Sequence, residues 1–347
     1  MSRAEGYKIL SIFLGFVILI YVLRDLTEVP KGSDDEFYIR KIYQRHSQKK
    51  NANESLKQED EMVYTASDVP LIWIGGVPRS GTTLSRALLD AHPDVRCGEE
   101  TRVIPQMLSF HARMQNSELE KARLDEAKVT VDVMESALKS YILSIIVNHG
   151  EPALRYCNKD PFTLRSMNLI LRLFPNSKFI LMVRDGRAVV HSIISRKVLI
   201  SGFNTDSYSD ALRDWNRAFY FMYKLCLQNS KVCMPVPYEK LVIDPEPQLR
   251  RIFKFLDIPW NDIVLHHERT IGKRGGVSLS RKEASTDQVN KPINTKALYE
   301  WVKHMPKMVK DNAAVIAPML KVVGYDPDNP VVNYGTKPEE LATESMD

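Results

Sequence analysis

The stretch LIWIGGVPRSGTTLSRALLDA, residues 71–91, decides the fold expected for this chain. It begins with four apolar residues and then turns at two glycines, which predicts a short buried strand. From Thr82 onward the apolar side chains recur at helical spacing, at Leu84, Ala87, Leu88 and Ala91. A buried strand that leads through a glycine turn into a helix is typical of a parallel α/β sheet.

The same alternation continues along the chain. Residues 178–183 (KFILMV) are a second apolar run, and residues 234–238 predict another strand. Long helices are expected at 130–149, 212–226 and 245–257, and a shorter one is expected between Arg187 and Arg196. Strands separated by helices predict an α/β fold, in which a P-loop-like parallel sheet is flanked by helices on both faces.

The glycine turn has the spacing of a phosphate-binding loop but lacks its lysine. Gly76 and Gly81 fit the pattern G-x4-G-K-[ST], whereas Thr82 stands where that pattern has lysine. Backbone N–H groups at the start of a helix bind anions, and Arg79 adds a cation one turn earlier. The turn therefore predicts a phosphate site. The missing lysine disfavours a P-loop kinase that uses ATP, which stays as an alternative.

Composition bounds the class of protein. The chain has 347 residues, of which 44% are hydrophobic and 26% charged, so a packed core is expected and wholesale disorder is excluded. The net charge of +5 suits an anionic ligand or an acidic peptide and is too small to indicate nucleic acid. Four cysteines without metal-ligand spacing predict no metal site.

The N-terminal segment differs from the rest. Residues 9–23 read ILSIFLGFVILIYVL, an uncharged run between Lys8 and Arg24. We expect a transmembrane signal-anchor over 9–24, with residues 1–8 in the cytosol, because the basic residues precede the run and acidic ones follow it. A cleaved signal peptide is the alternative, although no pair of small residues marks a cleavage site.

The anchor is followed by a polar stem over 25–68, in which Asn53-Glu54-Ser55 is a glycosylation acceptor if the stem is lumenal. We expect the catalytic domain over 69–335 and a flexible tail over 336–347.

Several blocks of the chain resemble a known family. PRSGTTL is similar to the 5′-phosphosulfate loop of sulfotransferases, and Arg184 and Ser192 in VRDGRAVVHSIISR resemble their 3′-phosphate site. The motifs CGEETRVIP, CNKDPF, HHE and STDQV, among others between residues 70 and 335, resemble tyrosylprotein sulfotransferases. The resemblance implies the sulfotransferase fold and transfer of a sulfuryl group from 3′-phosphoadenylyl sulfate (PAPS) to tyrosine in acidic protein contexts. It also implies a Golgi type II membrane enzyme that forms a homodimer.

The resemblance also assigns catalytic roles. A tyrosine hydroxyl is little ionised at neutral pH, so transfer to it needs a base. Glu100 is implied as that base, with Glu99 as the neighbouring alternative. Lys159 is implied as the cation at the leaving group, and Ser285 as a further hydrogen-bond donor.

Binding roles are implied in the same way. The cofactor residues are Arg79, Ser80, Gly81, Thr82, Thr83, Arg184, Ser192, Arg196, Tyr238, Ser285, Thr286, Asp287, Gln288, Val289, Asn290, Lys291, Pro292, Ile293 and Asn294. The acceptor residues are Arg102, Val103, Ile104, Pro105, Gln106 and Arg123. This chain departs from the family at Gln106, where arginine is common, and at Glu300, where lysine often precedes the tryptophan; Lys296 and Lys303 are the alternative cations.

The four cysteines allow three pairings. The resemblance implies Cys97–Cys157 and Cys226–Cys233, with buried free thiols as the alternative. His191, His266 and His267 have no spaced partner and are expected to be structural.

Three other functions stay open besides tyrosine sulfation. A carbohydrate sulfotransferase would share both phosphate blocks, but CGEETRVIP and CNKDPF favour a protein acceptor. The P-loop kinase is disfavoured by Thr82. A membrane-tethered binding protein without activity is disfavoured because the expected base, lysine and both phosphate blocks are present together.

Overall fold

A computed structural model describes residues 69–329, apart from 281, 284, 294, 296 and 297, together with residues 334 and 335. The expected anchor, the stem with Asn53 and the tail lie outside the described residues. Among the described residues, no helix has the length and apolar character needed to cross a membrane.

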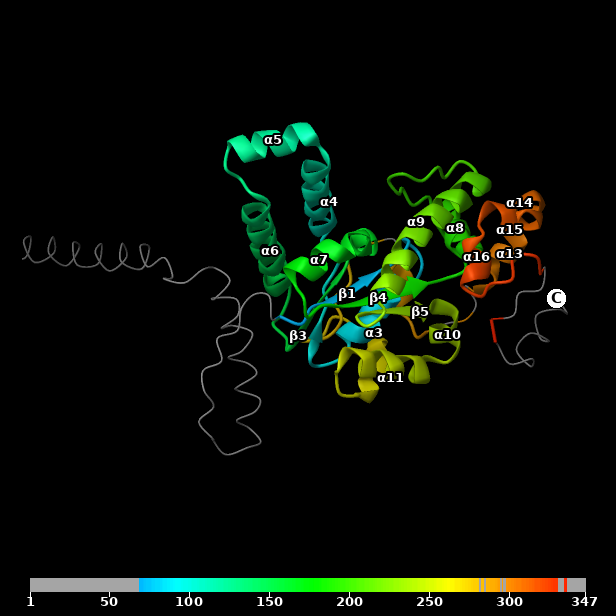
Figure 1. Cartoon of the computed structure of the whole chain (residues 1–347). Coiled ribbons are helices and arrows are strands. Elements are labelled where there is room, and N and C mark those ends of the chain that lie inside the picture. The colour runs from blue at the N-terminus through cyan, green and yellow to red at the C-terminus, as the bar shows by residue number, and fades with distance from the viewer. Residues whose placement is uncertain are drawn as a thin grey trace, which may run out of the picture.

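The centre of the structure is a five-stranded parallel sheet (Figure 1). Its strand order is β2-β3-β1-β4-β5. The strands are β1 (Ile72–Gly75), β2 (Val95–Arg96), β3 (Arg155–Lys159), β4 (Lys178–Val183) and β5 (Cys233–Pro237). The predicted fold class, a parallel sheet flanked by helices, is confirmed.

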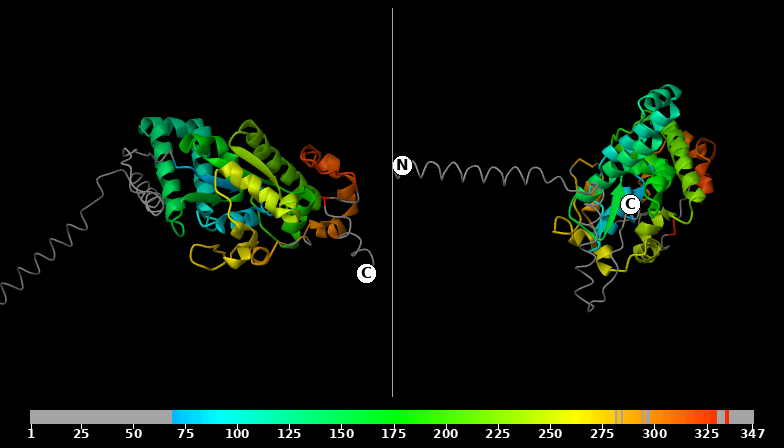
Figure 2. Two further views of the ribbon diagram at one scale, coloured as in Figure 1. Left: turned by 90° about the horizontal axis from the view of Figure 1, so that it is seen from below. Right: turned by 60° about the vertical axis from the view of Figure 1, so that its left-hand side comes forward.

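Helices cover both faces of the sheet (Figures 1 and 2). One face packs against α3 (Thr82–Asp90), α10 (Tyr238–Ile243) and α11 (Pro245–Leu256). The opposite face packs against α6 (Val131–Asn148), α7 (Met167–Leu173), α8 (Gly186–Ser195) and α9 (Tyr208–Gln228).

The remaining helices extend this frame. α4 (Val103–Asn116) and α5 (Glu118–Glu126) form a projection with α6, and α5 lies at its outer end (Figure 1). Short helices complete the C-terminal part, and three of them, α13, α15 and α16, contact α8 or α9. They are α12 (Thr286–Val289), α13 (Glu300–His304), α14 (Lys307–Asp311), α15 (Ala313–Ile316) and α16 (Met319–Val322), and two 3-10 segments span Pro161–Ser166 and Asp262–Arg269.

Strand β1 is apolar throughout because both of its faces are covered. Ile72 and Ile74 belong to the core under α3 and α11, whereas Leu71 and Trp73 belong to the core under α6 and α9. Successive side chains of a strand point to opposite faces, so a strand buried on both sides reads as an unbroken apolar run. The one polar atom in this run is satisfied, since Trp73 Nε1 donates to Ser177 Oγ over 3.0 Å.

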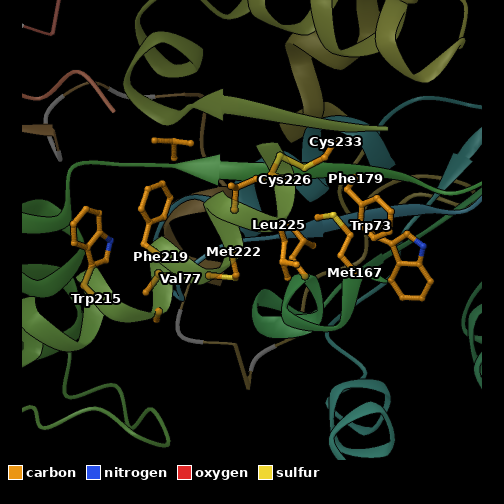
Figure 3. Close-up of a cluster of buried hydrophobic side chains, with 14 of the residues drawn as sticks. Trp73, Val77, Met167, Phe179, Trp215, Phe219, Met222, Leu225, Cys226 and Cys233 are labelled. Carbon is orange, nitrogen blue, oxygen red and sulfur yellow. A yellow bond between two sulfur atoms is a disulfide. The ribbon is translucent and has the colours of Figure 1, made fainter. Parts of the chain in front are cut away.

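Helix α9 contributes aromatic side chains to the core under α6 and α9 (Figure 3). Trp215 and Phe219 lie one turn apart and their rings stack with centroids 5.2 Å apart. The expected helix over 212–226 begins earlier, at Tyr208, because the Ser207 side chain caps it by accepting from the Asp210 backbone N–H.

Both implied disulfides are present. Cys226–Cys233 ties the end of α9 to β5 (Figure 3), with Cα atoms 5.2 Å apart. Cys97–Cys157 ties the segment after β2 to β3, and its Cα atoms lie 4.4 Å apart. Together they account for all four cysteines.

Candidate active site

The carboxyl ends of the five strands bring the expected site residues to one edge of the sheet. In open parallel sheets this edge is where ligands bind. The phosphate loop, residues 76–83, follows β1, while Lys159 ends β3 and Arg184 follows β4. Tyr238 follows β5, and Glu100 comes shortly after β2, three residues beyond the disulfide-bonded Cys97. Residues spread over more than 150 positions therefore belong to one edge.

The phosphate loop has a backbone that only glycine suits at two positions. Gly76 and Gly81 have φ angles of 149° and 100°, and a Cβ on Gly81 would collide with the Tyr238 ring. Gly81 also offers no side chain to cap the first N–H groups of α3. The Ser80 hydroxyl is buried and has no hydrogen-bond partner among the described residues. Donors without partners at a helix start fit an anionic group such as a phosphosulfate.

Arg79 of this loop lies close to two further arginines, Arg184 and Arg196. Arg79 Nε donates to Ser192 Oγ over 3.0 Å, and Arg184 Nη1 donates to the Arg79 carbonyl over 2.8 Å. Arg184 also lies over the Tyr238 ring, 4.5 Å from its centroid. Burial, followed by the charges of Arg196 and Arg184, lowers the pKa of Arg79 to about 10. Cations held this close repel one another, so the site favours a polyanion.

A cavity of about 280 Å³ joins these groups. Its wall includes members of the phosphate loop, both arginines of the predicted 3′-phosphate site and the segment expected to cover the cofactor. Among them are Arg79, Gly81, Thr82, Thr83, Arg184, Arg196, Tyr238, Ser285, Lys291 and Ile293. Eleven of the predicted cofactor residues therefore line this cavity, whereas Ser192 lines a smaller one together with Arg184 and Arg196.

Beside the phosphate loop lies a buried ionic cluster. Lys159 is fully buried, and its Nζ donates to Glu100 Oε1 over 2.6 Å and to Glu283 Oε2 over 2.9 Å. Glu99, the alternative base, instead lies 3.6 Å from His149. The structure thus joins Glu100 to Lys159 and adds Glu283, and neither of these contacts was predicted from the sequence.

Glu283 is ionised in this cluster. Burial raises its pKa, but Lys159, Arg86 and the Glu100 backbone N–H together outweigh burial and hold the pKa below its ordinary value. No local signal distinguishes this glutamate in SRKEASTDQV, which reads as a polar loop.

A second unpredicted residue, Asp160, fixes the loop that carries Glu100. It follows Lys159 and is almost fully buried. Its carboxylate accepts from Thr101 Oγ1 over 2.6 Å and from the Arg102 backbone N–H over 2.8 Å. Arg102 has a left-handed φ of 58°, which starts α4 directly after the loop. The sequence signal that could have identified Asp160 is its position within the motif CNKDPF.

The segment expected to cover the cofactor begins at this cluster. Ser285 Oγ accepts a hydrogen bond from the Arg79 guanidinium. Residues 286–289 form α12, and Lys291 and Ile293 line the cavity. Asn294 and the side chains of Asp287 and Gln288 lie outside the described part of the chain.

The expected acceptor residues separate into two groups. Arg102 is exposed and its Nε lies 3.7 Å from Glu100 Oε2, beside the ionic cluster. Residues 103–106 form the first turn of α4, where Ile104 is fully buried. Arg123 lies on α5, at the outer end of the projection in Figure 1, and pairs with Glu120 over 2.7 Å.

The two departures from the family pattern lie in different places, and only Glu300 is at the predicted 3′-phosphate site. Glu300 lines a small cavity together with Arg184, Ser192 and Arg196. Lys303 is exposed on the same helix, α13, and Lys296 lies outside the described residues. Gln106 is exposed on the first turn of α4.

His267 contacts the segment that is expected to cover the cofactor. Its ring is fully buried, and its Nε2 donates to the Val289 carbonyl over 2.8 Å. Burial lowers its pKa despite the opposing effects of Val289 and Glu268, so the folded state binds the proton less readily than the unfolded chain. Stability from this group is complete above the unfolded pKa of about 6.5 and is lost as the pH falls below that value.

We therefore expect the His267→Gln variant, whose amide still donates to Val289, to lose less unfolding free energy than the wild type between pH 7 and pH 5.5. Urea unfolding at both pH values measures this difference. The matched control is His266→Gln, because His266 is half exposed. Equal pH dependence in wild type and His267→Gln would contradict the expectation.

The sequence of this chain is similar to those of known enzymes. A model of the sulfotransferase family matches residues 70–262. Protein-tyrosine sulfotransferase 1 of Danio rerio is 59% identical over 278 residues, which cover 80% of this chain and 78% of that protein. Protein-tyrosine sulfotransferase 2 of Gallus gallus is 55% identical over 295 residues, covering 84% and 80%. The human protein-tyrosine sulfotransferase 1 is 59% identical over 279 residues, covering 80% and 75%.

A solved structure supports the fold. The sulfotransferase domain of the Synechococcus PCC 7002 olefin synthase has a TM-score of 0.52 and 20% identity, and it covers 78% of this chain and 99% of that domain. The sulfotransferase domain of the curacin pathway has the same TM-score.

Proposed function

Because this chain belongs to the sulfotransferase family and, within it, to the protein-tyrosine sulfotransferases, we propose that it transfers a sulfuryl group from PAPS to tyrosine hydroxyls in acidic protein segments. The products are O-sulfotyrosine and adenosine 3′,5′-bisphosphate. The observation that carries the proposal is the contact between Glu100 and Lys159 beside the phosphate loop.

The anion-binding groups support PAPS as the co-substrate. Ser80, Arg79 and the first N–H groups of α3 would bind the 5′-phosphosulfate, whereas Arg184, Ser192 and Arg196 would bind the 3′-phosphate. When bound, PAPS supplies an electron-poor sulfuryl group attached to a phosphate leaving group. These residues would hold it with the sulfur toward the cluster of Glu100 and Lys159.

Glu100 and Lys159 would act at the two ends of the transfer. The Glu100 carboxylate takes the proton from the tyrosine hydroxyl as the new S–O bond forms. The Lys159 ammonium donates to the bridging oxygen as the old S–O bond breaks and negative charge develops there. Ser285, held by Arg79, would donate to the same leaving group.

Arg102 supports an acidic acceptor. It is exposed and lies beside Glu100, so a carboxylate next to the target tyrosine would meet a positive charge there. A single exposed ion pair is worth about 0–1 kcal/mol, so several such contacts must act together. Arg123 would take part only through a peptide long enough to reach α5.

The two disulfides support an oxidising compartment, because such bonds are rare in the cytosol. We place the enzyme in the Golgi membrane as a single-pass type II protein with a lumenal catalytic domain, which acts on secretory and membrane proteins. A homodimer is also proposed, because the family resemblance implies one.

Arg184→Ala is expected to weaken binding of adenosine 3′,5′-bisphosphate about tenfold to a hundredfold, because one hydrogen bond to a charged group is worth about 1.5–3 kcal/mol. Isothermal titration calorimetry measures the affinity. Arg217→Ala serves as the control, since Arg217 is exposed on α9 and pairs only locally with Asp214 among the described residues. Unchanged affinity in Arg184→Ala would remove Arg184 from the cofactor site.

The choice of acceptor molecule tests the proposed function. The full chain is incubated with PAPS and either an acidic tyrosine peptide, its neutral counterpart or a glycan. We expect sulfation of the acidic peptide, and a rise in salt from about 50 to 300 mM should increase its KM more than that of the neutral peptide. Sulfation of the glycan alone would support a carbohydrate sulfotransferase instead.

A further inference from the structure

Glu283 joins the elements that carry the proposed chemistry, although it is not expected to touch either substrate. Glu283 is only 8% exposed. Its Oε2 accepts from Lys159 Nζ over 2.9 Å, and its Oε1 accepts from the Glu100 backbone N–H over 2.9 Å. Thr83 Oγ1 lies 3.5 Å from Oε2. One carboxylate therefore bridges the end of β3, the loop of the base and the start of α3.

The hydrogen bonds of Lys159 show why this bridge matters. A lysine ammonium has three donors. They are directed to Glu283 at 2.9 Å, Glu100 at 2.6 Å and Thr83 at 3.4 Å. Lys159 must therefore give up one of these partners before it donates to a leaving group. The side chain of Glu100 is 19% exposed and that of Glu283 is 5% exposed, so Glu100 is the partner on the accessible side.

The buried charge needs a permanent counter-ion. Lys159 has no exposed surface, and a buried ammonium without a partner is strongly destabilised. If Glu100 were its sole carboxylate, releasing Glu100 would leave the ammonium uncompensated. Glu283 removes this conflict. Two cations face it, Lys159 from β3 and Arg86 from α3, and both favour its ionised form. The Glu100 carboxylate shares the Lys159 ammonium with it.

We propose that Glu283 is a positioning residue, which holds the Lys159 ammonium and the Glu100 backbone in place so that the Glu100 carboxylate is free to take the tyrosine proton. The proposal rests on the proposed function. Because Glu283 precedes Ser285 by two residues, the same contact also anchors the start of the segment that covers the cofactor.

Three variants separate the charge of Glu283 from its shape. Glu283→Gln keeps an oxygen acceptor for the Glu100 N–H but loses the charge that faces Lys159. It is expected to lower kcat about tenfold to a hundredfold, the worth of one hydrogen bond to a charged group. Glu283→Asp keeps the charge and should retain more turnover than Glu283→Gln. The affinity for adenosine 3′,5′-bisphosphate should stay within about threefold of wild type in both, since neither variant changes a phosphate contact.

Glu283→Ala removes the acceptor as well, while Glu100 still pairs with Lys159 and supports folding. In the unliganded full chain, we expect hydrogen exchange at the Glu100 amide to become at least about tenfold faster, because its hydrogen bond is lost. Glu135→Gln is the control for both measurements, since Glu135 pairs with Arg172 on the α6 side, away from the cluster.

Turnover of Glu283→Gln within about threefold of wild type would overturn the proposal. Unchanged exchange at Glu100 in Glu283→Ala would also overturn it, whatever the activity. If the wild type transfers no sulfate and Glu283→Ala still accelerates exchange, the proposed function fails and the anchoring by Glu283 stands.

Discussion

Replacing Lys159 with methionine is expected to lower turnover about 10²–10³-fold, the usual cost of removing one donor at a site of developing charge. The fold should be destabilised as well. Methionine fills a similar volume but leaves Glu100 and Glu283 as neighbouring carboxylates without their cation. Removing one partner of a buried ion pair typically costs about 3–5 kcal/mol, because the remaining charge is uncompensated.

The destabilisation of Lys159→Met should shrink in acid. Without Lys159, the pKa of Glu283 loses its largest lowering influence and rises relative to wild type, although Arg86 and the Glu100 N–H remain. The folded variant then binds a proton more readily than the folded wild type, so its stability relative to wild type increases as the pH falls. Urea unfolding at pH 7 and pH 5 measures this, and Lys224→Met, at an exposed lysine of α9, is the control. Full turnover in Lys159→Met would exclude the lysine from the reaction.

Glu100→Gln is the second variant expected to have a large effect. General-base catalysis is worth about 10²–10⁴-fold, so kcat should fall by that factor. The amide keeps the size of the side chain, and Glu100 makes no predicted phosphate contact, so affinity for adenosine 3′,5′-bisphosphate should change little. Steady-state kinetics and calorimetry measure the two quantities separately.

Glu99→Gln provides the matched control. The side chain of Glu99 contacts His149 rather than Lys159, so its removal should leave kcat within about threefold of wild type. The reverse result, with Glu99→Gln inactive and Glu100→Gln active, would transfer the role of base to Glu99.

Three of the five strands were predicted from sequence. β1 and β4 are apolar runs because most of their side chains pack among other apolar side chains, so a local pattern reveals them. The strand expected at 234–238 is β5, Cys233–Pro237, which is only partly buried. β3 reads RYCNK and was missed as a strand, although its last four residues are buried. Its polar members are tolerated inside because Asn158 donates to Asp160 and Lys159 pairs with two glutamates.

The site residues also divide into those that a local sequence pattern predicts and those that only folding brings together. The phosphate loop is continuous in sequence, so its spacing alone predicts an anion site. Glu283 lies 124 residues from Lys159 in the chain, and only folding brings the two together. The family resemblance identified Glu100 and Lys159 as separate motifs, but the carboxylate that joins them was not predictable from composition, periodicity or spacing.

Sulfuryl transfer to tyrosine is tested by following both products of one reaction. The wild-type chain is incubated with PAPS and an acidic peptide that contains one tyrosine, and mass spectrometry quantifies adenosine 3′,5′-bisphosphate and sulfotyrosine together. We expect equal amounts of both products from the wild type and a parallel loss of both in Glu100→Gln. Release of the nucleotide without sulfotyrosine, or sulfate on a residue other than tyrosine, would contradict this expectation.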